Sequence, residues 1–162
     1  GMTEPTAPAA APAPLTSGPT GYWLTPVASD AEATAEQIVQ TLVGKEKVYA
    51  FSERKPGRTK LKPGDGICFY ASGTGVIAHA TVASAPTKQT HKKVRHTEKY
   101  PYVFTLTEPK LYLDNPVVID AERRAKLKAF EGRDPQKSWA WLVQGTRALV
   151  EGDFEVLTRI ES

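Results

Sequence analysis

The chain has 162 residues, of which 40% are hydrophobic and 24% are charged, as is typical of one soluble globular domain. Its single cysteine excludes an internal disulfide and a cysteine-based zinc site, and no apolar run approaches the ~20 residues that a membrane helix needs. The net charge of +3 alone is weak support for a nucleic-acid partner, and the lack of a signal-peptide pattern indicates a cytoplasmic protein.

The N-terminal part predicts a tail, a strand and a helix. Residues 1–20 are rich in Pro and Ala, so we expect a disordered tail and a folded domain over residues 21–162. Aromatic and β-favouring residues predict a strand over Tyr22–Val27. A capping-box pattern, Ser29-Asp30-Ala31-Glu32, predicts a helix with Ser29 as N-cap, and Gly44 is expected to end it.

The centre of the chain is the most β-like part. Residues 47–51 predict a second short strand. Residues 67–71 and 76–84 predict a hairpin joined by Ser72-Gly73-Thr74-Gly75. A long strand is expected over residues 100–113, with an interruption near Pro109.

The C-terminal part predicts a short helix over residues 120–130 with Asp120 as its cap, a strand over 139–143, and a closing helix over 153–160. The last helix should bury Phe154, Leu157 and Ile160. Altogether we expect an α+β fold, a mixed and partly closed β-barrel of five or six strands with two or three short helices at its edges.

A search for catalytic machinery finds little. The sequence has no glycine-rich phosphate loop of either common type. His79 lies in the middle of a predicted strand, where a structural or pocket-rim role is favoured over that of a catalytic base. His91 and His96 lack nearby carboxylates at metal-ligand spacing. We therefore expect no enzyme, no cofactor and no metal.

Positive charge is concentrated in two stretches, residues 53–62 and 88–99, with five basic residues each and one acidic residue each. Two such segments beside one sheet favour a phosphate-facing surface. Aromatic residues lie near the same strands. Most of them are expected to fill a core, but as a group they also suit stacking on a base, worth ~1–3 kcal/mol per base. An aromatic pocket with cations outside it would suit a flipped-out base.

Four passages resemble the EVE domain family, a branch of the PUA-like superfamily related to YTH domains. They are Tyr22-Trp23-Leu24; residues 48–54 followed by 61–65, with a Lys-Pro-Gly-Asp turn; Phe69-Tyr70-Ala71-Ser72 with residues 75–78; and Lys137-Ser138-Trp139 with Gly145 and residues 152–154. Their order and spacing make the resemblance fairly specific, and it covers residues 22–160.

The resemblance implies a PUA-like barrel that reads a modified base, either a methylated or hydroxymethylated cytosine in DNA or a modified base in RNA. A downstream effect would then need a protein partner. The base-pocket candidates that it implies are Trp23, Thr25, Tyr49, Ser52, Tyr70 and Trp139, the last of which either lines the pocket or anchors the core. The candidates for contact with the nucleic-acid backbone are Arg54, Arg58, Lys60, Lys88, Lys92, Lys93 and Arg95.

Two other functions remain open. A pocket of this kind could hold a free nucleoside or another planar small molecule, with the basic loops serving solubility. An enzyme that uses His79 would need a second catalytic group, and no partner for His79 is evident in the sequence.

Overall fold

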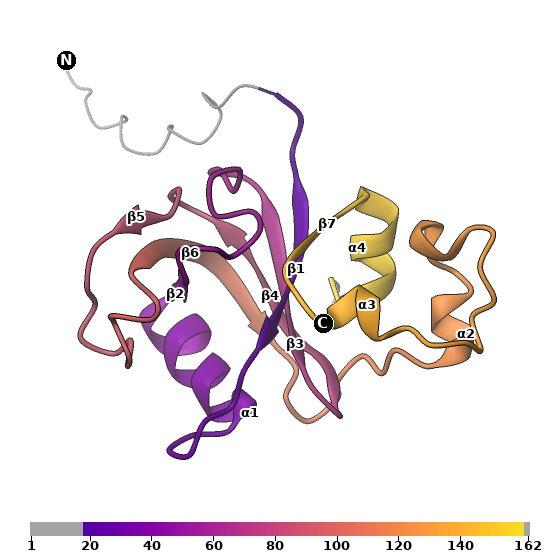
Figure 1. The fold of residues 1–162 in the computed structure, drawn as a ribbon, viewed down its shortest axis with the longest axis horizontal. Helices are drawn as coiled ribbons and strands as arrows, with labels where there is room; N and C mark the ends of the chain where they lie inside the picture. The colour runs from indigo at the N-terminus through magenta and orange to yellow at the C-terminus, as the bar shows by residue number, and fades with distance from the viewer. Residues whose placement is uncertain (1–17, 161–162) are drawn as a thin grey trace.

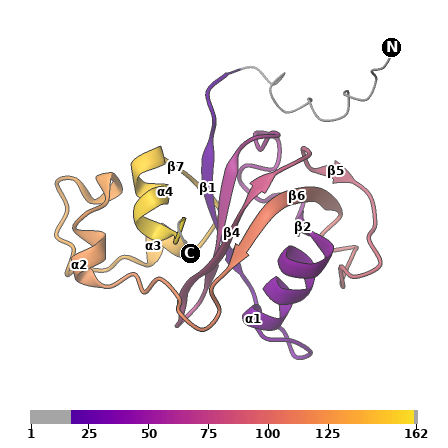
Figure 2. The same cartoon turned by 180° about the vertical axis from the view of Figure 1, so that it is seen from behind.

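The computed structural model of the chain describes residues 18–160. The tail predicted over residues 1–20 therefore lies outside the described residues, apart from residues 18–20. A seven-stranded sheet curls into a half-barrel, with one long helical segment beside β2 and β6 and the remaining helices gathered at the other end (Figures 1 and 2). This arrangement confirms the predicted α+β class.

The strands are β1 (Tyr22–Val27), β2 (Val48–Phe51), β3 (Gly66–Ala71), β4 (Gly75–Val82), β5 (Thr87–Lys88), β6 (Tyr102–Leu111) and β7 (Arg147–Leu149). The helical segments are α1 (Ala35–Ile38), the π-helical η3 (Val39–Glu46), α2 (Ala121–Arg124), the 3-10 helix η4 (Lys128–Phe130), α3 (Ala140–Val143) and α4 (Glu151–Leu157). Five of the predicted strands are present, and two short strands, β5 and β7, bring the sheet above the expected five or six.

The sheet has the order β2-β6-β4-β3-β1-β7, and β5 pairs with β6. β1 runs parallel to β3, and the other pairs are antiparallel. The buried carboxylate of Asp65, which precedes β3, accepts hydrogen bonds from the backbone of Gly21 (2.9 Å) and the indole of Trp23 (3.0 Å). It also accepts bonds from the backbone and the ammonium group of Lys62. The Lys-Pro-Gly-Asp turn thus ties the start of β1 to β3.

Alternation along β3 sorts the core into two clusters on the two faces of the sheet. Ile67, Phe69 and Ala71 belong to a cluster with the buried residues of η3 and β2, whereas Cys68 and Tyr70 belong to a cluster with the C-terminal helices. This division follows from the two-residue period of a strand.

The first helix begins five residues later than predicted. Thr34, not Ser29, is the N-cap, and it forms a reciprocal capping box with Gln37. Asp30 instead closes a local turn, because its side chain accepts hydrogen bonds from the backbone N–H groups of residues 32 and 33. Gly44 does not end the helix either. A Cβ atom at Gly44 would lie 3.0 Å from the side chain of Leu111, so the glycine lets η3 approach β6 closely.

The C-terminal part also differs in detail. The strand predicted over residues 139–143 is wrong, because Ala140–Val143 forms the helix α3, which buries Leu142 in the second cluster. The expected burial of Ile160 is wrong as well, because α4 ends at Leu157 and Ile160 is 48% exposed. The cap at Asp120 is confirmed. The strand expected to be interrupted near Pro109 runs continuously as β6 through this position, but its pairing with β4 shifts register there, with Glu108 at φ 53°.

Candidate functional site

A cavity of about 420 Å³ lies between the end of β1, the segment α1–η3, β2 and the loop over residues 93–100. Two parts of the chain that are far apart in sequence, residues 26–55 and 93–100, therefore build one hollow over the first core cluster. Its lining comprises Pro26, Ala28, Ser29, Asp30, Ala33, Gln37, Ile38, Thr41, Leu42, Tyr49, Ala50, Lys55, Lys93, Val94, Arg95, His96, Lys99 and Tyr100. The volume falls in the range of about 300–1,000 Å³ that is usual for small-ligand sites.

Two tyrosines give the cavity aromatic walls. Tyr49 is 8% exposed, and its ring packs edge-on against Phe69 at a centroid distance of 5.1 Å, which fixes its orientation. Burial raises the pKa of the Tyr49 hydroxyl well above its usual range, so that it stays protonated. Tyr100 is half-buried and packs against the same core cluster. A planar ligand in this cavity would contact both rings and the aliphatic side chains of Ile38 and Leu42.

Four cationic side chains, Lys55, Lys93, Arg95 and Lys99, also line the cavity. Lys55 is half-buried, and burial lowers its pKa. The ammonium group of Lys99 lies 5.6 Å from the centre of the Tyr100 ring. Lys93 and Lys99 are otherwise exposed. The cavity therefore combines aromatic walls with positive charge, as a nucleotide requires.

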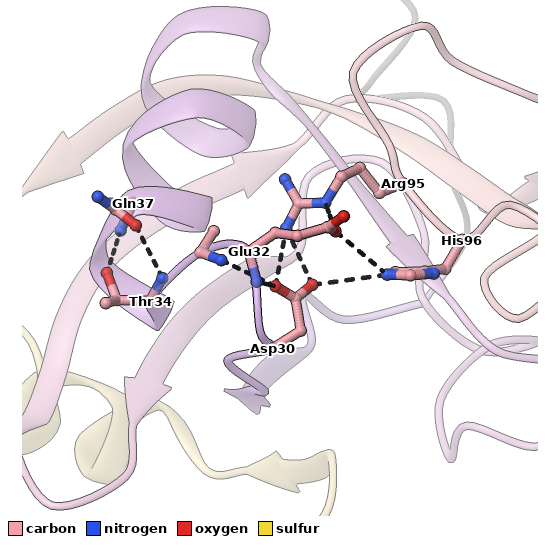
Figure 3. Close-up of polar contacts among 7 residues, drawn as sticks. Asp30, Glu32, Thr34, Gln37, Arg95 and His96 are labelled. Carbon is pink, nitrogen blue, oxygen red and sulfur yellow. Dashed lines mark hydrogen bonds and ion pairs between the residues drawn. The ribbon is translucent and has the colours of Figure 1, made fainter.

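The 93–100 loop is held in place by a cluster of charges at the start of the helical segment (Figure 3). The Arg95 guanidinium donates to both carboxylate oxygens of Asp30 at 2.9 and 3.1 Å, and its Nε lies 3.1 Å from Glu32. His96 Nε2 lies 3.7 Å from Asp30 and 3.8 Å from Glu32. The hydrogen bond from Arg95 is the main reason that the pKa of Asp30 falls to about 2. Buried Val94 anchors the loop from below.

Asp30, Glu32 and His96 are also the group of potential metal ligands that residues 18–160 contain, with donor atoms within 4.8 Å of one another. Arg95 already occupies both carboxylates. One guanidinium is thus shared by the two carboxylates, and the structural effect of the cluster is to close the loop onto the helix start.

The six predicted base-pocket residues do not line one cavity in the structure. Tyr49 lines the cavity, whereas the other five are not in its wall as the described residues form it. Trp23 is engaged elsewhere, since its indole N–H is bonded to Asp65 and its ring packs against Gly57. Thr25 is fully buried and its hydroxyl lies 2.7 Å from that of Thr146.

The remaining predicted pocket residues lie apart from Tyr49. Tyr70 and Trp139 belong to the second cluster, on the opposite face of the sheet, with ring centroids 6.5 Å apart. The Arg124 guanidinium lies 4.8 Å from the centre of the Trp139 ring. Ser52 is half-buried in the turn after β2, where its backbone carbonyl accepts a hydrogen bond from the N–H of Lys55.

The predicted backbone-contact residues are also dispersed. Lys93 and Arg95 line the cavity. Arg58 lies over the ring of Tyr102 at 4.2 Å and pairs with Glu53. The side chains of Arg54, Lys60 and Lys92 are exposed, and Lys88 lies in β5. Lys88 and Lys99 line a second hollow of about 450 Å³, so Lys99 borders both hollows.

Sequence reasoning missed several residues of the cavity wall. Lys55 and Lys99 fall in the two basic stretches but are not among the predicted contact residues. Tyr100 is predicted to begin a strand, yet it lines the cavity. Gln37 and Thr41 lie on the helical segment, where their only signal is a polar residue on the face opposite the apolar stripe. No sequence pattern indicates that the 93–100 loop folds over this face.

The two residues with potential chemistry outside the cavity are both packed within the protein. His79 Nδ1 lies 3.1 Å from the hydroxyl of Tyr112, and burial lowers the pKa of the imidazole, with a smaller effect from Lys110. Cys68 is fully buried, and burial raises the pKa of its thiol. These surroundings are those of a neutral histidine and an unreactive thiol.

In residues 18–160 no helix combines the length and apolar character required to cross a bilayer. No protein-family model matches the chain, and no curated protein matches it by sequence. Solved structures that resemble it include a YTH domain and two bacterial proteins. The YTH domain of Mmi1, solved in complex with RNA, is 11% identical over 84% of this chain and 74% of that one, with a TM-score of 0.50.

The other two are bacterial proteins. Atu2648 from Agrobacterium tumefaciens is 16% identical over 85% of this chain and 91% of its own, with a TM-score of 0.46. Rpa0253 from Rhodopseudomonas palustris is 10% identical over 85% and 90%, with a TM-score of 0.45. At these identities the likeness concerns the fold, and the curled half-barrel with short helices at its edges is consistent with a PUA-like fold of the kind found in the YTH domain.

Proposed function

We propose that the chain is a non-catalytic nucleic-acid-binding module that takes a single modified base into the cavity between Tyr49 and Tyr100. The observation that carries the proposal is the coincidence, in one cavity of about 420 Å³, of two aromatic side chains with four cationic ones. The base class is the one that the EVE-like motifs imply: a methylated or hydroxymethylated cytosine in DNA, or a modified base in RNA. Membership of the EVE family is part of the same proposal.

The cavity offers a base both stacking and polar contacts. The Tyr49 and Tyr100 rings provide aromatic surface, worth ~1–3 kcal/mol for a stacked base. The hydroxyl of Thr41 and the amide of Gln37 lie in the same wall, although the Gln37 carbonyl oxygen is already bonded to the backbone of Thr34. The Thr41 hydroxyl and the Gln37 NH₂ group could therefore bond with the edge of a base.

The exposed cations in the cavity lining suit the phosphates that adjoin a bound base. Lys93 and Lys99 are exposed in its lining, and Lys99 also borders the second hollow, which contains Lys88. A strand with one base in the cavity would carry its next phosphate past Lys99. Each phosphate neutralised along a single strand should add about −0.7 to the slope of log K against log salt concentration.

The likeness to a YTH domain supports this proposal at the level of the fold, because that domain was solved with RNA bound. A half-barrel with helices at its edges is thus a scaffold on which a nucleic-acid site has been built at least once. For this chain, the choice of ligand rests on the cavity and on the EVE-like motifs, since fold alone does not establish function.

The test is a fluorescence-anisotropy titration of the full chain with short oligonucleotides, DNA and RNA, single- and double-stranded, each with and without the modified base. We expect tighter binding of one modified oligonucleotide than of its unmodified match. Lys93→Gln should weaken binding of both and make it less dependent on salt, because Lys93 contacts phosphate. Lys45→Gln is the matched control, since it removes an exposed positive charge that is not in the cavity lining. Equal affinity for all modified and unmodified oligonucleotides at low salt would contradict the proposal.

A second candidate function is a sensor of a free nucleoside or a similar planar molecule. It is favoured by the pairing of Arg95 with Asp30 and Glu32, which leaves this guanidinium less available to a phosphate backbone. Thermal-shift measurements separate the two functions, because a bound ligand raises the melting temperature in proportion to the logarithm of its concentration. If a nucleoside raises the melting temperature and the matching oligonucleotide does not, the result favours the sensor.

A further inference from the structure

A pair of arginines contacts Trp141, which packs against the second cluster, on the face of the sheet opposite the cavity. The Arg133 guanidinium lies 4.5 Å from the centre of the Trp141 ring, and that of Arg147 lies 5.1 Å from it. Phe130 packs against the same ring at 5.0 Å, with the planes 33° apart. Arg147 belongs to the edge strand β7, whereas the cavity wall at Tyr49 belongs to β2 at the other edge. In Figures 1 and 2, β7 lies beside the C-terminal helices, whereas β2 lies beside the first helical segment at the other end of the domain.

Neither guanidinium is neutralised by a carboxylate. Within the part of the chain that the structure describes, neither Arg133 nor Arg147 has an acidic oxygen within 4.0 Å. Arg95, in contrast, forms ion pairs with the carboxylates of both Asp30 and Glu32. Moreover, Nε of half-buried Arg147 is the one buried side-chain nitrogen or oxygen of residues 18–160 without a hydrogen-bond partner. A positive group that is partly desolvated and unpaired favours the approach of an anion.

The acidic residues closest in sequence do not supply that anion. Glu131 lies 3.7 Å from Lys128, and the Asp134 carboxylate accepts a hydrogen bond from the backbone of Gln136. The indole fixes the planes of the two guanidiniums by cation–π contact, which reduces the side-chain freedom that binding would otherwise remove. Each guanidinium carries several N–H donors of the kind that phosphate oxygens accept.

We propose that Arg133 and Arg147, held by Trp141, form a second anion site that binds a backbone phosphate of a nucleic-acid strand. Phosphate is favoured over a carboxylate of an acidic peptide because the two guanidiniums together offer more donors than one carboxylate accepts, whereas a phosphate has enough oxygens for both. The site goes beyond base recognition, because it needs neither the cavity nor a modified base. It gives the domain a contact with nucleic acid on its far side.

The test uses the full chain labelled with ¹⁵N, titrated with inorganic phosphate against chloride at constant ionic strength. We expect a saturable shift of the Trp141 indole N–H signal. The Trp23 indole serves as an internal reference, because it is bonded to Asp65. Arg147→Gln and Arg133→Gln should each weaken phosphate binding by at least about fivefold, and Arg147→Lys should weaken it by less. Lys126→Gln, which removes an exposed charge outside this cluster, should leave phosphate binding unchanged.

A second titration uses an unmodified single-stranded oligonucleotide and a glutamate-rich peptide. Arg147→Gln should reduce the salt slope for the oligonucleotide by about 0.7, the value for one phosphate of a single strand. The inference is overturned if the Trp141 signal does not respond to phosphate, if the variants respond like the parent, or if only the peptide shifts the signal. Phosphate binding at Trp141 without any preference for a modified base would refute the proposed function but leave this site standing.

Discussion

Replacing Asp65 with asparagine should lower the free energy of unfolding by about 2–4 kcal/mol. Asp65 is 1% exposed and accepts four hydrogen bonds. One oxygen, Oδ1, accepts from the backbone of Gly21 and the ammonium group of Lys62. The other, Oδ2, accepts from the indole of Trp23 and the backbone of Lys62. Both oxygens are therefore fully used as acceptors.

The magnitude follows from this division. An asparagine must place its NH₂ group where one of the two oxygens was, so two donors lose their acceptor and face another donor. A lost bond to a charged group costs about 1.5–3 kcal/mol, and an unpaired buried donor costs about 1–3 kcal/mol. Part of the lost interaction is with Lys62, which is 27% exposed and is screened by water, so the sum is discounted.

The assay is urea unfolding followed by tryptophan fluorescence, with Asp114→Asn as control, because Asp114 is an exposed aspartate. Trp23→Phe should cost less than Asp65→Asn, since it removes one of the four bonds. In the double variant the two effects should not add, because both remove the same contact. A loss below about 1 kcal/mol for Asp65→Asn would refute the assigned role of this carboxylate as the tie between β1 and β3.

Three further results are expected. Gly75→Ala should cost more than about 2 kcal/mol and more than Gly73→Ala in the same unfolding assay, because a Cβ atom at Gly75 would collide with a backbone carbonyl, whereas at Gly73 it meets open space; equal costs would contradict this. The folded pKa of Asp30, about 2, lies below its usual value of 3.8, so its contribution to stability is present above pH 3.8 and is lost as the pH falls toward 2; Arg95→Gln should return the pKa toward 3.8 in a carboxyl NMR titration, and an unchanged pKa would show that Arg95 is not the cause. Thr41→Val should weaken binding of the preferred base up to about tenfold while Thr41→Ser does not, as measured by anisotropy; equal effects of the two would exclude a hydrogen bond from this hydroxyl.

Where local pattern alone decides the structure, the sequence predicts this fold well. The strand over Tyr22–Val27 matches β1 residue for residue, and the alternation along β3 correctly divides its side chains between two cores. The helix start shows where local pattern fails. Two capping-box patterns lie five residues apart, at Ser29 and Thr34, and Thr34 is the cap that forms. The difference between the two patterns lies at Asp30, beside Ser29. Its carboxylate pairs with Arg95, which is 65 residues away in the sequence.

The site was harder to predict than the fold, for a similar reason. The EVE-like resemblance implies that Tyr49, an aromatic residue near a basic stretch, is a pocket residue, and it does line the cavity. Trp23 and Trp139 carry the same signal, yet one is bonded to Asp65 and the other packs in the cluster on the opposite face. Aromatic residues serve cores and binding sites alike, so composition near a strand cannot distinguish them. Tyr100 enters the wall only because its loop folds back over the helix.

The construction of the cavity from a loop laid over a sheet has a consequence for hydrogen exchange. The amides of the central strands β3 and β4 lie in paired ladders within the buried core, so they should exchange only through opening of the whole domain. The 93–100 loop is held by exposed ion pairs and one buried valine, and it should open locally at much lower free energy. Entry of a ligand therefore need not disturb the sheet. A bound ligand should slow exchange in this loop and leave the central strands as they were.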